Sequence, residues 1–338
     1  MRTILVPTRF DPTSRRAVRS AARLQRDHDH RVVLLHAVKP PAREALSLSS
    51  EPTEALERRC HRREEKLEAR AEAVFHDTDD VRTHVTVGAP AQVISRFAAE
   101  KKPALVVMGS DEGPPSSRLL YGSVTLDVIH KVDQDVLIVP ESASPAQLPP
   151  RRVLIATALE GEASTLIDHA ARWVESDAEI ELFHVVSRPL LGSADRSLWM
   201  RATEQLAKLA ARRTRPDVRI RSHLVQANDV APAIISRGHD IEADMLVVGQ
   251  RDRGLLRSLV TQDLLAELHH RIARPTLFIP LPPTPSEPAF AKVSLSPAPD
   301  EDKAMRSPLA VPLPGRPVQP PMRPLAVAHA RRLSKLPI

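Results

Sequence analysis

The strongest candidates for binding chemistry in this chain are a glycine and a serine at the start of a predicted helix. Gly122 and Ser123 follow a polar loop and precede a segment whose apolar residues have helical spacing. Backbone N–H groups at a helix start attract anions such as phosphate, and the helix dipole and a serine hydroxyl add to this attraction. A Gly-Ser pair is also an ordinary helix cap, so the pair allows a phosphate site without requiring one.

Motifs of common catalytic and metal sites are absent from the sequence. It contains no G-x4-G-K-[ST] phosphate loop, no G-x-S-x-G turn, no H-E-x-x-H helix and no C-x-x-C pair. The polar run Asp27–His30 falls in a turn, where adjacent side chains diverge, and is expected to be solvated. His36 and His184 end two apolar segments and are expected to be packed and hydrogen-bonded. We therefore expect a protein that is not an enzyme and requires no metal.

The segment that carries the candidate residues occurs twice. Residues 104–140 spell an apolar strand, a polar loop, a helix and the strand VLIVP, and residues 243–280 repeat this order up to TLFIP. A chain of 338 residues also exceeds the size of one ordinary core. We predict one domain over 1–142 and a second over 151–281, joined by a linker rich in proline and serine.

Each repeat alternates apolar strands with amphipathic helices. Five strands are predicted in the first repeat, at residues 3–7, 31–38, 81–87, 104–109 and 135–140. This order predicts an α/β fold in which each repeat is a doubly wound, five-stranded parallel sheet. A ligand crevice in such a sheet lies beyond the carboxyl ends of the strands, where the strand order reverses. If the first and fourth strands flank that point, Pro7–Asp11 and Gly109–Thr125 line the crevice.

The last part of the chain, residues 282–338, differs from the repeats in composition. It holds 14 of the 32 prolines and is expected to be disordered. It also has eight Lys or Arg against four Asp or Glu, so +4 of the net charge of +6 lies there. With near-neutral repeats and only nine aromatic residues, specific nucleic-acid binding is not expected. Residues 325–336 contain no proline and are able to form a basic amphipathic helix that binds an acidic groove of a protein partner or an anionic membrane surface. The alternative is a tail that only adds solubility.

Cysteine content and hydropathy indicate the compartment. The chain has one cysteine, Cys60, so it forms no internal disulfide and suits a reducing environment. No apolar run reaches the roughly 20 residues that span a bilayer. We expect a cytoplasmic protein without a transmembrane segment.

The chain resembles the universal stress protein (UspA) family in a tandem form. The opening ILVPTRFDPTSRRAV resembles that family's first strand and helix, and VVMGS, LLYGSVT and VLIVP resemble its nucleotide-binding end. The resemblance covers residues 1–280 in two copies. It implies the adenine-nucleotide alpha-hydrolase-like fold and pairing of the fifth strands, Val136–Val139 with Thr276–Ile279, into an intramolecular pseudo-dimer. It also allows a homodimer.

The resemblance implies an ATP or AMP site in the first domain. In the ATP-binding branch of the family, the loop after the fourth strand carries G-x2-G-x9-G-[ST]. Gly109, Gly122 and Ser123 match this pattern, while Arg9 takes the place of the family's Asp and Ala37 stands where backbone groups meet adenine. The implied site residues are Pro7, Thr8, Arg9, Ala37, Met108, Gly109, Ser110, Gly122, Ser123, Val124 and Thr125.

Two departures from the pattern bear on binding. Glu112 replaces the second glycine, and a carboxylate facing phosphate oxygens costs on the order of 1–4 kcal/mol. Arg9 cannot accept a hydrogen bond as Asp can, but it can pair with phosphate. The second repeat departs further, with Ala158 at the Asp position and Asp252, Gln262 and Asp263 in the loop, so we interpret it as a structural copy.

Three functions follow from these patterns. The first is a non-catalytic stress-response sensor or adaptor that binds ATP or AMP in the first domain. The second is a nucleotide-free scaffold that recruits a partner through its basic tail. A slow ATPase is the least expected of the three.

Overall fold

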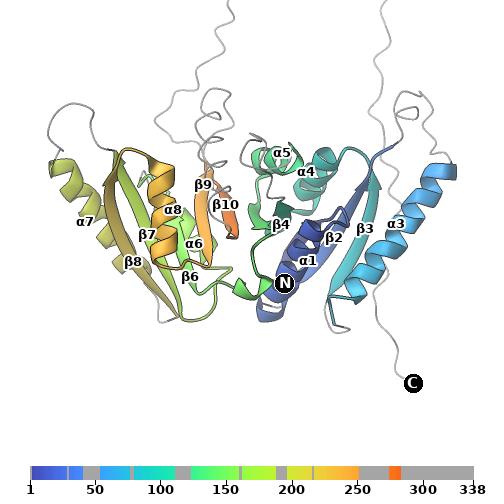
Figure 1. Cartoon of the computed structure of the whole chain (residues 1–338), viewed down its shortest axis with the longest axis horizontal. Helices are drawn as coiled ribbons and strands as arrows, with labels where there is room; N and C mark the ends of the chain where they lie inside the picture. The colour runs from blue at the N-terminus through green and yellow to red at the C-terminus, as the bar shows by residue number, and fades with distance from the viewer. Residues whose placement is uncertain are drawn as a thin grey trace, which may run out of the picture.

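A computed structural model describes residues 2–28, 30–40, 54–76, 80–110, 123–159, 162–187, 196–214, 217–250 and 274–282. Its first repeat contains the strands β1 (Thr3–Pro7), β2 (Arg31–Val38), β3 (Val81–Val87), β4 (Leu105–Ser110) and β5 (Asp135–Pro140). Its second repeat contains β6 (Arg152–Ala156), β7 (Ala178–Ser187), β8 (Val218–Ala227), β9 (Met245–Gln250) and β10 (Thr276–Pro280). All ten strands belong to one sheet, in the order β3-β2-β1-β4-β5-β10-β9-β6-β7-β8 (Figure 1).

Helices cover both faces of this sheet. They are α1 (Pro12–His28), α3 (Glu54–Glu72), α4 (Pro90–Lys101), α5 (Ser123–Lys131), α6 (Ala163–Ala170), α7 (Arg196–Arg213) and α8 (Val230–Asp240). The core on one face includes residues of α1, α3, α6 and α7, and the core on the other face includes residues of α4, α5 and α8. Each core contains residues of both repeats. The chain therefore has the predicted α/β fold, and its two repeats share continuous cores.

The apolar pattern of the strands follows from this double coverage. Within β1, Ile4 and Val6 pack into one core and Leu5 packs into the other. A strand that is buried on both faces needs apolar residues at successive positions, as parallel sheets do. The highly charged helix α3 forms because Leu56, Leu67 and other apolar residues at helical spacing face the core.

The two repeats meet at their fifth strands. β5 and β10 pair in antiparallel orientation, with Leu277 opposite Leu137, and the two halves of the molecule lie side by side in Figure 1. This pairing was expected. A side-chain contact adds to it, because His169 Nδ1 lies 2.7 Å from Oδ1 of the buried Asp135.

The segment between the repeats packs against the first helix. It contains the 3-10 helix η1 (Pro145–Gln147), and both Ala143 and Leu148 are buried. Arg16 of α1 donates a hydrogen bond to the Ala143 carbonyl and Arg23 donates one to the Leu148 carbonyl, each at 2.8 Å. The predicted linker therefore holds a fixed position along α1.

The second repeat has a buried turn after its first helix, and part of it lies outside the described residues. Helix α6 ends at Ala170, and Trp173 is buried in the turn beyond it. There the backbone N–H of Trp173 donates a hydrogen bond to the Ala170 carbonyl and closes a tight turn. Residues 251–273 of the second repeat and the predicted tail beyond Pro282 lie outside the described residues.

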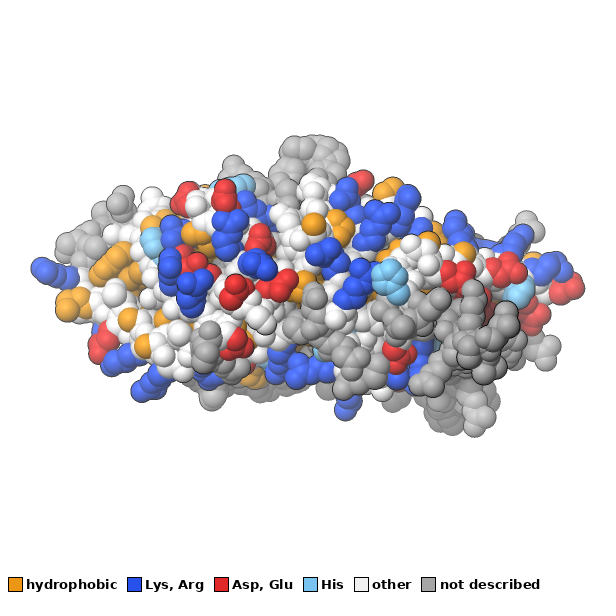
Figure 2. All heavy atoms as spheres, turned by 90° about the horizontal axis from the view of Figure 1, so that it is seen from below, with side chains coloured by type: hydrophobic (Ala, Val, Ile, Leu, Met, Phe, Trp, Pro, Cys, Tyr) orange, Lys and Arg blue, Asp and Glu red, His pale blue; other side chains and the backbone are white. Residues whose placement is uncertain are grey.

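The described part of the chain gives two further results. None of its helices is both long and apolar enough to cross a membrane, and none of its His, Cys, Asp and Glu side chains form a group of three or more that could hold a metal ion. On the face seen in Figure 2, basic and acidic side chains are interspersed.

Candidate functional site

The strand order of the first repeat reverses between β1 and β4. β1 pairs with β2 on one side and with β4 on the other, all in parallel. At this point lies a cavity with a volume of about 150 Å³, lined by the loop after β1, the ends of β2 and β4, and the first turns of α1, α4 and α5. The cavity is therefore located where the sequence predicted a crevice.

Most of the predicted site residues line this cavity. Eight of the eleven do so: Pro7, Thr8, Arg9, Ala37, Met108, Gly109, Val124 and Thr125. Ser110 is a buried residue of β4 and is not among the lining residues. Gly122 and the side chain of Ser123 lie outside the described residues, although α5 begins at Ser123 as expected. Glu112 and the rest of residues 111–122 lie outside them too.

The loop after β1 is fixed by its own hydrogen bonds. The Thr8 N–H donates to the Leu35 carbonyl at 2.9 Å, which ties the loop to β2. Phe10 has a φ of 69°, a left-handed conformation that is uncommon for a residue other than glycine. Asp11 Oδ1 accepts a 2.7 Å hydrogen bond from the Ser14 N–H, as an N-cap residue does at a helix start. The loop therefore reaches the cavity in a defined shape.

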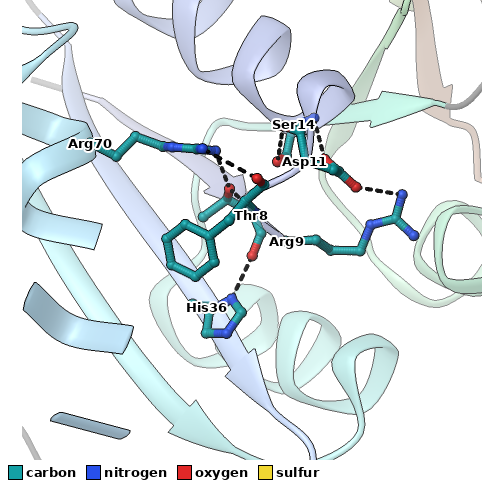
Figure 3. Close-up of polar contacts among 7 residues, drawn as sticks. Thr8, Arg9, Asp11, Ser14, His36 and Arg70 are labelled. Carbon is teal, nitrogen blue, oxygen red and sulfur yellow. Dashed lines mark hydrogen bonds and ion pairs between the residues drawn. The ribbon is translucent and has the colours of Figure 1, made fainter. Parts of the chain in front are cut away.

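Arg9 and Asp11 form an ion pair at the edge of the cavity. Their side chains approach to 2.8 Å, and 61% of the Arg9 side chain is exposed (Figure 3). Burial alone would raise the pKa of Asp11, but hydrogen bonds from Ser14 and the charge of Arg9 outweigh burial and lower that pKa. Asp11 is thus ionised at neutral pH, and Arg9 is held at the cavity by a charged partner.

His36 lines the cavity next to Ala37. Its Nδ1 lies 2.7 Å from the Thr8 carbonyl oxygen, which only accepts, so Nδ1 carries the proton (Figure 3). Burial lowers the pKa of His36 despite this hydrogen bond, and the charges of Arg63 and Lys66 lower it further. The ring is therefore neutral and leaves Nε2 as an acceptor. The sequence predicted the packing of His36 but not its place at the cavity.

Three basic residues of α3 surround the Phe10 ring beside the cavity. The charged groups of Arg63, Lys66 and Arg70 lie 5.4, 5.0 and 5.2 Å from the ring centroid. Arg70 also donates to Thr8 Oγ1 and to the Phe10 carbonyl, each at 3.4 Å. Sequence reasoning missed this group. The available signal was the 63, 66, 70 spacing, which places all three on one face of a helix.

The packing of α1 on β4 requires a glycine at position 109. A Cβ at this position would lie 2.7 Å from the carbonyl carbon of Thr13, and closer still to the carbonyl oxygen. The first turn of α1 therefore rests directly on β4. The glycine match in the sequence has a structural cause independent of phosphate.

The second repeat keeps the same loop, but side chains of the protein itself bind the loop's backbone groups. His184 Nδ1 lies 2.7 Å from the Thr157 carbonyl, as His36 does from Thr8. The Ala158 N–H donates to Glu162 Oε1 at 2.6 Å, so a carboxylate of the protein already binds this backbone group. Leu281 lies so close to Gly249 that a Cβ there would overlap it.

Comparisons with known proteins agree with the tandem fold. The model of the universal stress protein family matches residues 1–140 and again residues 150–280. The chain belongs to the universal stress protein family. A search of curated proteins gives no match.

Among solved structures, this universal stress protein is similar to one from Archaeoglobus fulgidus, with 16% identity over 82% of this chain and 96% of that chain and a TM-score of 0.60. It is also similar to a putative universal stress protein from Pseudomonas aeruginosa, with 15% identity, coverages of 83% and 93% and a TM-score of 0.50. A universal stress protein in complex with cAMP is 24% identical over 41% of this chain and 96% of that chain, with a TM-score of 0.32. The first two likenesses show the shared fold.

Proposed function

We propose that this universal stress protein binds an adenine nucleotide, ATP or AMP, in its first repeat and acts as a non-catalytic sensor or adaptor in the cytoplasm. One observation carries the proposal. The first repeat has a cavity at the strand-order reversal, lined by Thr8, Arg9, Ala37 and the first turn of α5. Sites at this position in α/β sheets bind nucleotides through backbone groups and a helix start.

The chemistry of the lining fits such a ligand. The first N–H groups of α5 have no partner within the helix, so they are able to donate to a phosphate, and Val124 and Thr125 of this turn line the cavity. The exposed guanidinium of Arg9 supplies a second contact to phosphate. The base lies toward Ala37, next to the acceptor Nε2 of His36. Arg9 and the helix start meet the phosphate charge without a protein-bound metal.

We propose a protein without catalytic activity because His36 is poorly suited to act as a general base. A general base needs to gain a proton during the reaction, and catalytic histidines are oriented by a group that stabilises the imidazolium ion. His36 instead bonds a neutral carbonyl at Thr8, and burial and two nearby cations disfavour its charged form. This histidine is suited to hold the loop rather than to activate water.

Isothermal titration calorimetry of the full chain with ATP and AMP tests the proposal. We expect one nucleotide per chain and no phosphate release above a control without protein. Ala37→Phe fills the cavity and is expected to abolish binding. Val185→Phe is the matched control, because Val185 follows His184 in the second repeat as Ala37 follows His36, and it is expected to leave binding unchanged.

Melting temperatures of both variants verify that they fold. Absence of binding by the wild-type chain would refute the proposal and favour the nucleotide-free scaffold. Two nucleotides per chain would show that the second repeat also binds.

A further inference from the structure

A cluster of positive charge lies behind one wall of the cavity. We call Arg63, Lys66 and Arg70 of α3 the basic cluster. Their charged groups all lie within 5.4 Å of the centroid of the Phe10 ring. Figure 3 shows the guanidinium group of Arg70 directed toward Thr8, whereas the side chain of Arg9 extends away on the other side and meets Asp11. The end of β1 is therefore flanked by two separate cationic groups.

Within the described residues, no member of the basic cluster forms a direct ion pair with a carboxylate, although the charge of Asp11 acts on Arg70. Arg63 and Lys66 contact the Phe10 ring, and neither forms an ion pair or a hydrogen bond within this part of the chain. The two hydrogen bonds of Arg70 go to a hydroxyl and a carbonyl, which are neutral acceptors. Burial lowers the pKa of Arg70, Arg15 lowers it further, and Asp11 opposes both. An aromatic ring attracts a cation but does not neutralise three.

The arrangement of the cluster matches a small anion. Three charges that converge on one ring form a compact site, whereas a nucleic acid needs basic residues spread along its backbone. The cluster does not line the cavity itself but contacts or influences residues that do. Arg70 bonds Thr8, and the charges of Arg63 and Lys66 lower the pKa of His36, whose ring lies 4.5 Å from that of Phe10. Thr8 and His36 both line the cavity.

We propose that the basic cluster is a second anion subsite, and that the preferred ligand is a nucleoside bisphosphate with one phosphate at the 5′ position and one on the ribose. This inference rests on the proposed nucleotide binding in the first repeat. With the 5′-phosphate at α5 and Arg9 and the base toward Ala37, the ribose lies at the end of β1. A ribose phosphate then reaches toward α3. Arginine near a ribose similarly accommodates a ribose phosphate in dinucleotide folds.

Calorimetry on the full chain with three ligands tests this subsite. Adenosine 3′,5′-bisphosphate and its 2′,5′ isomer carry one phosphate at each position, and ADP carries both of its phosphates at the 5′ end. We expect one of the two bisphosphates to bind at least about tenfold more tightly than ADP. We also expect this preference to decrease as NaCl is raised, because the added contact is between charges.

Variants of α3 test whether the basic cluster causes the preference for a bisphosphate over ADP. Arg63→Gln combined with Lys66→Gln is expected to reduce the affinity for the bisphosphate to that for ADP and to leave the affinity for ADP unchanged. Arg58→Gln combined with Arg62→Gln is the matched control, since it removes the same charge from exposed positions of the same helix. The control variant is expected to keep the preference.

The outcomes separate this inference from the proposed function. If ADP binds and neither bisphosphate is preferred, the subsite is wrong while nucleotide binding stands. A preference that persists in the Arg63 and Lys66 variant would also overturn it, because the cluster would not be its cause. If no nucleotide binds, the proposed function fails and this inference fails with it.

Discussion

Substituting Gly109 by alanine tests whether α1 rests on β4. The added Cβ would lie 2.7 Å from the carbonyl carbon of Thr13, a backbone atom in the first turn of α1. Because this contact involves backbone, α1 has to shift as a unit. Overpacking of this kind typically costs about 1–3 kcal/mol. We therefore expect Gly109→Ala to lower the free energy of unfolding by that amount.

Gly238 offers a control with the opposite sign. It lies within α8, and a Cβ there would meet its nearest atom, Leu154 Cδ2, at an ordinary 3.7 Å. Alanine is favoured over glycine in a helix by roughly 1 kcal/mol. Gly238→Ala is therefore expected to stabilise the chain while Gly109→Ala destabilises it, although the two substitutions are chemically identical.

Urea denaturation of both variants measures the two effects, and melting temperature gives a second readout of about 2–4 °C per kcal/mol for a chain of this size class. Wild-type stability of Gly109→Ala, or reduced stability of Gly238→Ala, would refute the packing argument. Thr13 also lines the cavity, so Gly109→Ala is expected to weaken nucleotide binding through the shift of α1. Weaker binding in this variant would therefore not by itself show a phosphate contact at Gly109.

Three further predictions concern pH, the loop and the tail. The pKa values of His36, His84 and His130 are all lowered, chiefly by burial, so the folded chain binds fewer protons than the unfolded chain at acidic pH. Urea denaturation should therefore show full stability above the ordinary histidine pKa of about 6.5 and a loss of stability as pH falls below it. A stability that rises on acidification would contradict this. Glu112→Gly should increase the affinity for ATP in calorimetry, by roughly 1 kcal/mol or more, because it removes a like charge from the loop; equal or weaker binding would argue against repulsion. Removal of residues 282–338 should leave the melting temperature nearly unchanged. A tail that recruits protein partners predicts that these partners are lost from a pull-down with the truncated chain, and an unchanged set of proteins would show that the tail recruits none of them.

The strands and the position of the cavity could be predicted from the sequence because they follow from local pattern and topology. Thr3–Pro7 and Arg31–Val38 are apolar at successive positions, as strands covered on both faces need to be, and the structure has strands with these same bounds. Once a doubly wound sheet is predicted, its crevice follows from the strand order.

The remaining features depend on contacts between distant segments. Nothing local marks Arg63, Lys66 or Arg70 as neighbours of Phe10, because a charged face on a helix usually lies in water, and the crossover from β2 to β3 brings α3 against the loop after β1. The left-handed conformation of Phe10 has no signal in the sequence either, since glycine is the usual residue there. Likewise, a segment rich in proline and serine indicates a loop, but not that Arg16 and Arg23 bond its carbonyls.

Because β5 and β10 pair in antiparallel orientation within one chain, the two halves of the molecule can differ in sequence. In a dimer of identical subunits, closed twofold symmetry makes every substitution appear at both sites. Here the covalent link between the repeats keeps β10 at a high effective concentration near β5, whatever substitutions occur in the two crevices. Glu162 and Leu281 can therefore occupy the crevice of the second half while that of the first half stays open. A tandem chain thus has what a symmetric dimer lacks, namely one site that can specialise and one copy that supports it.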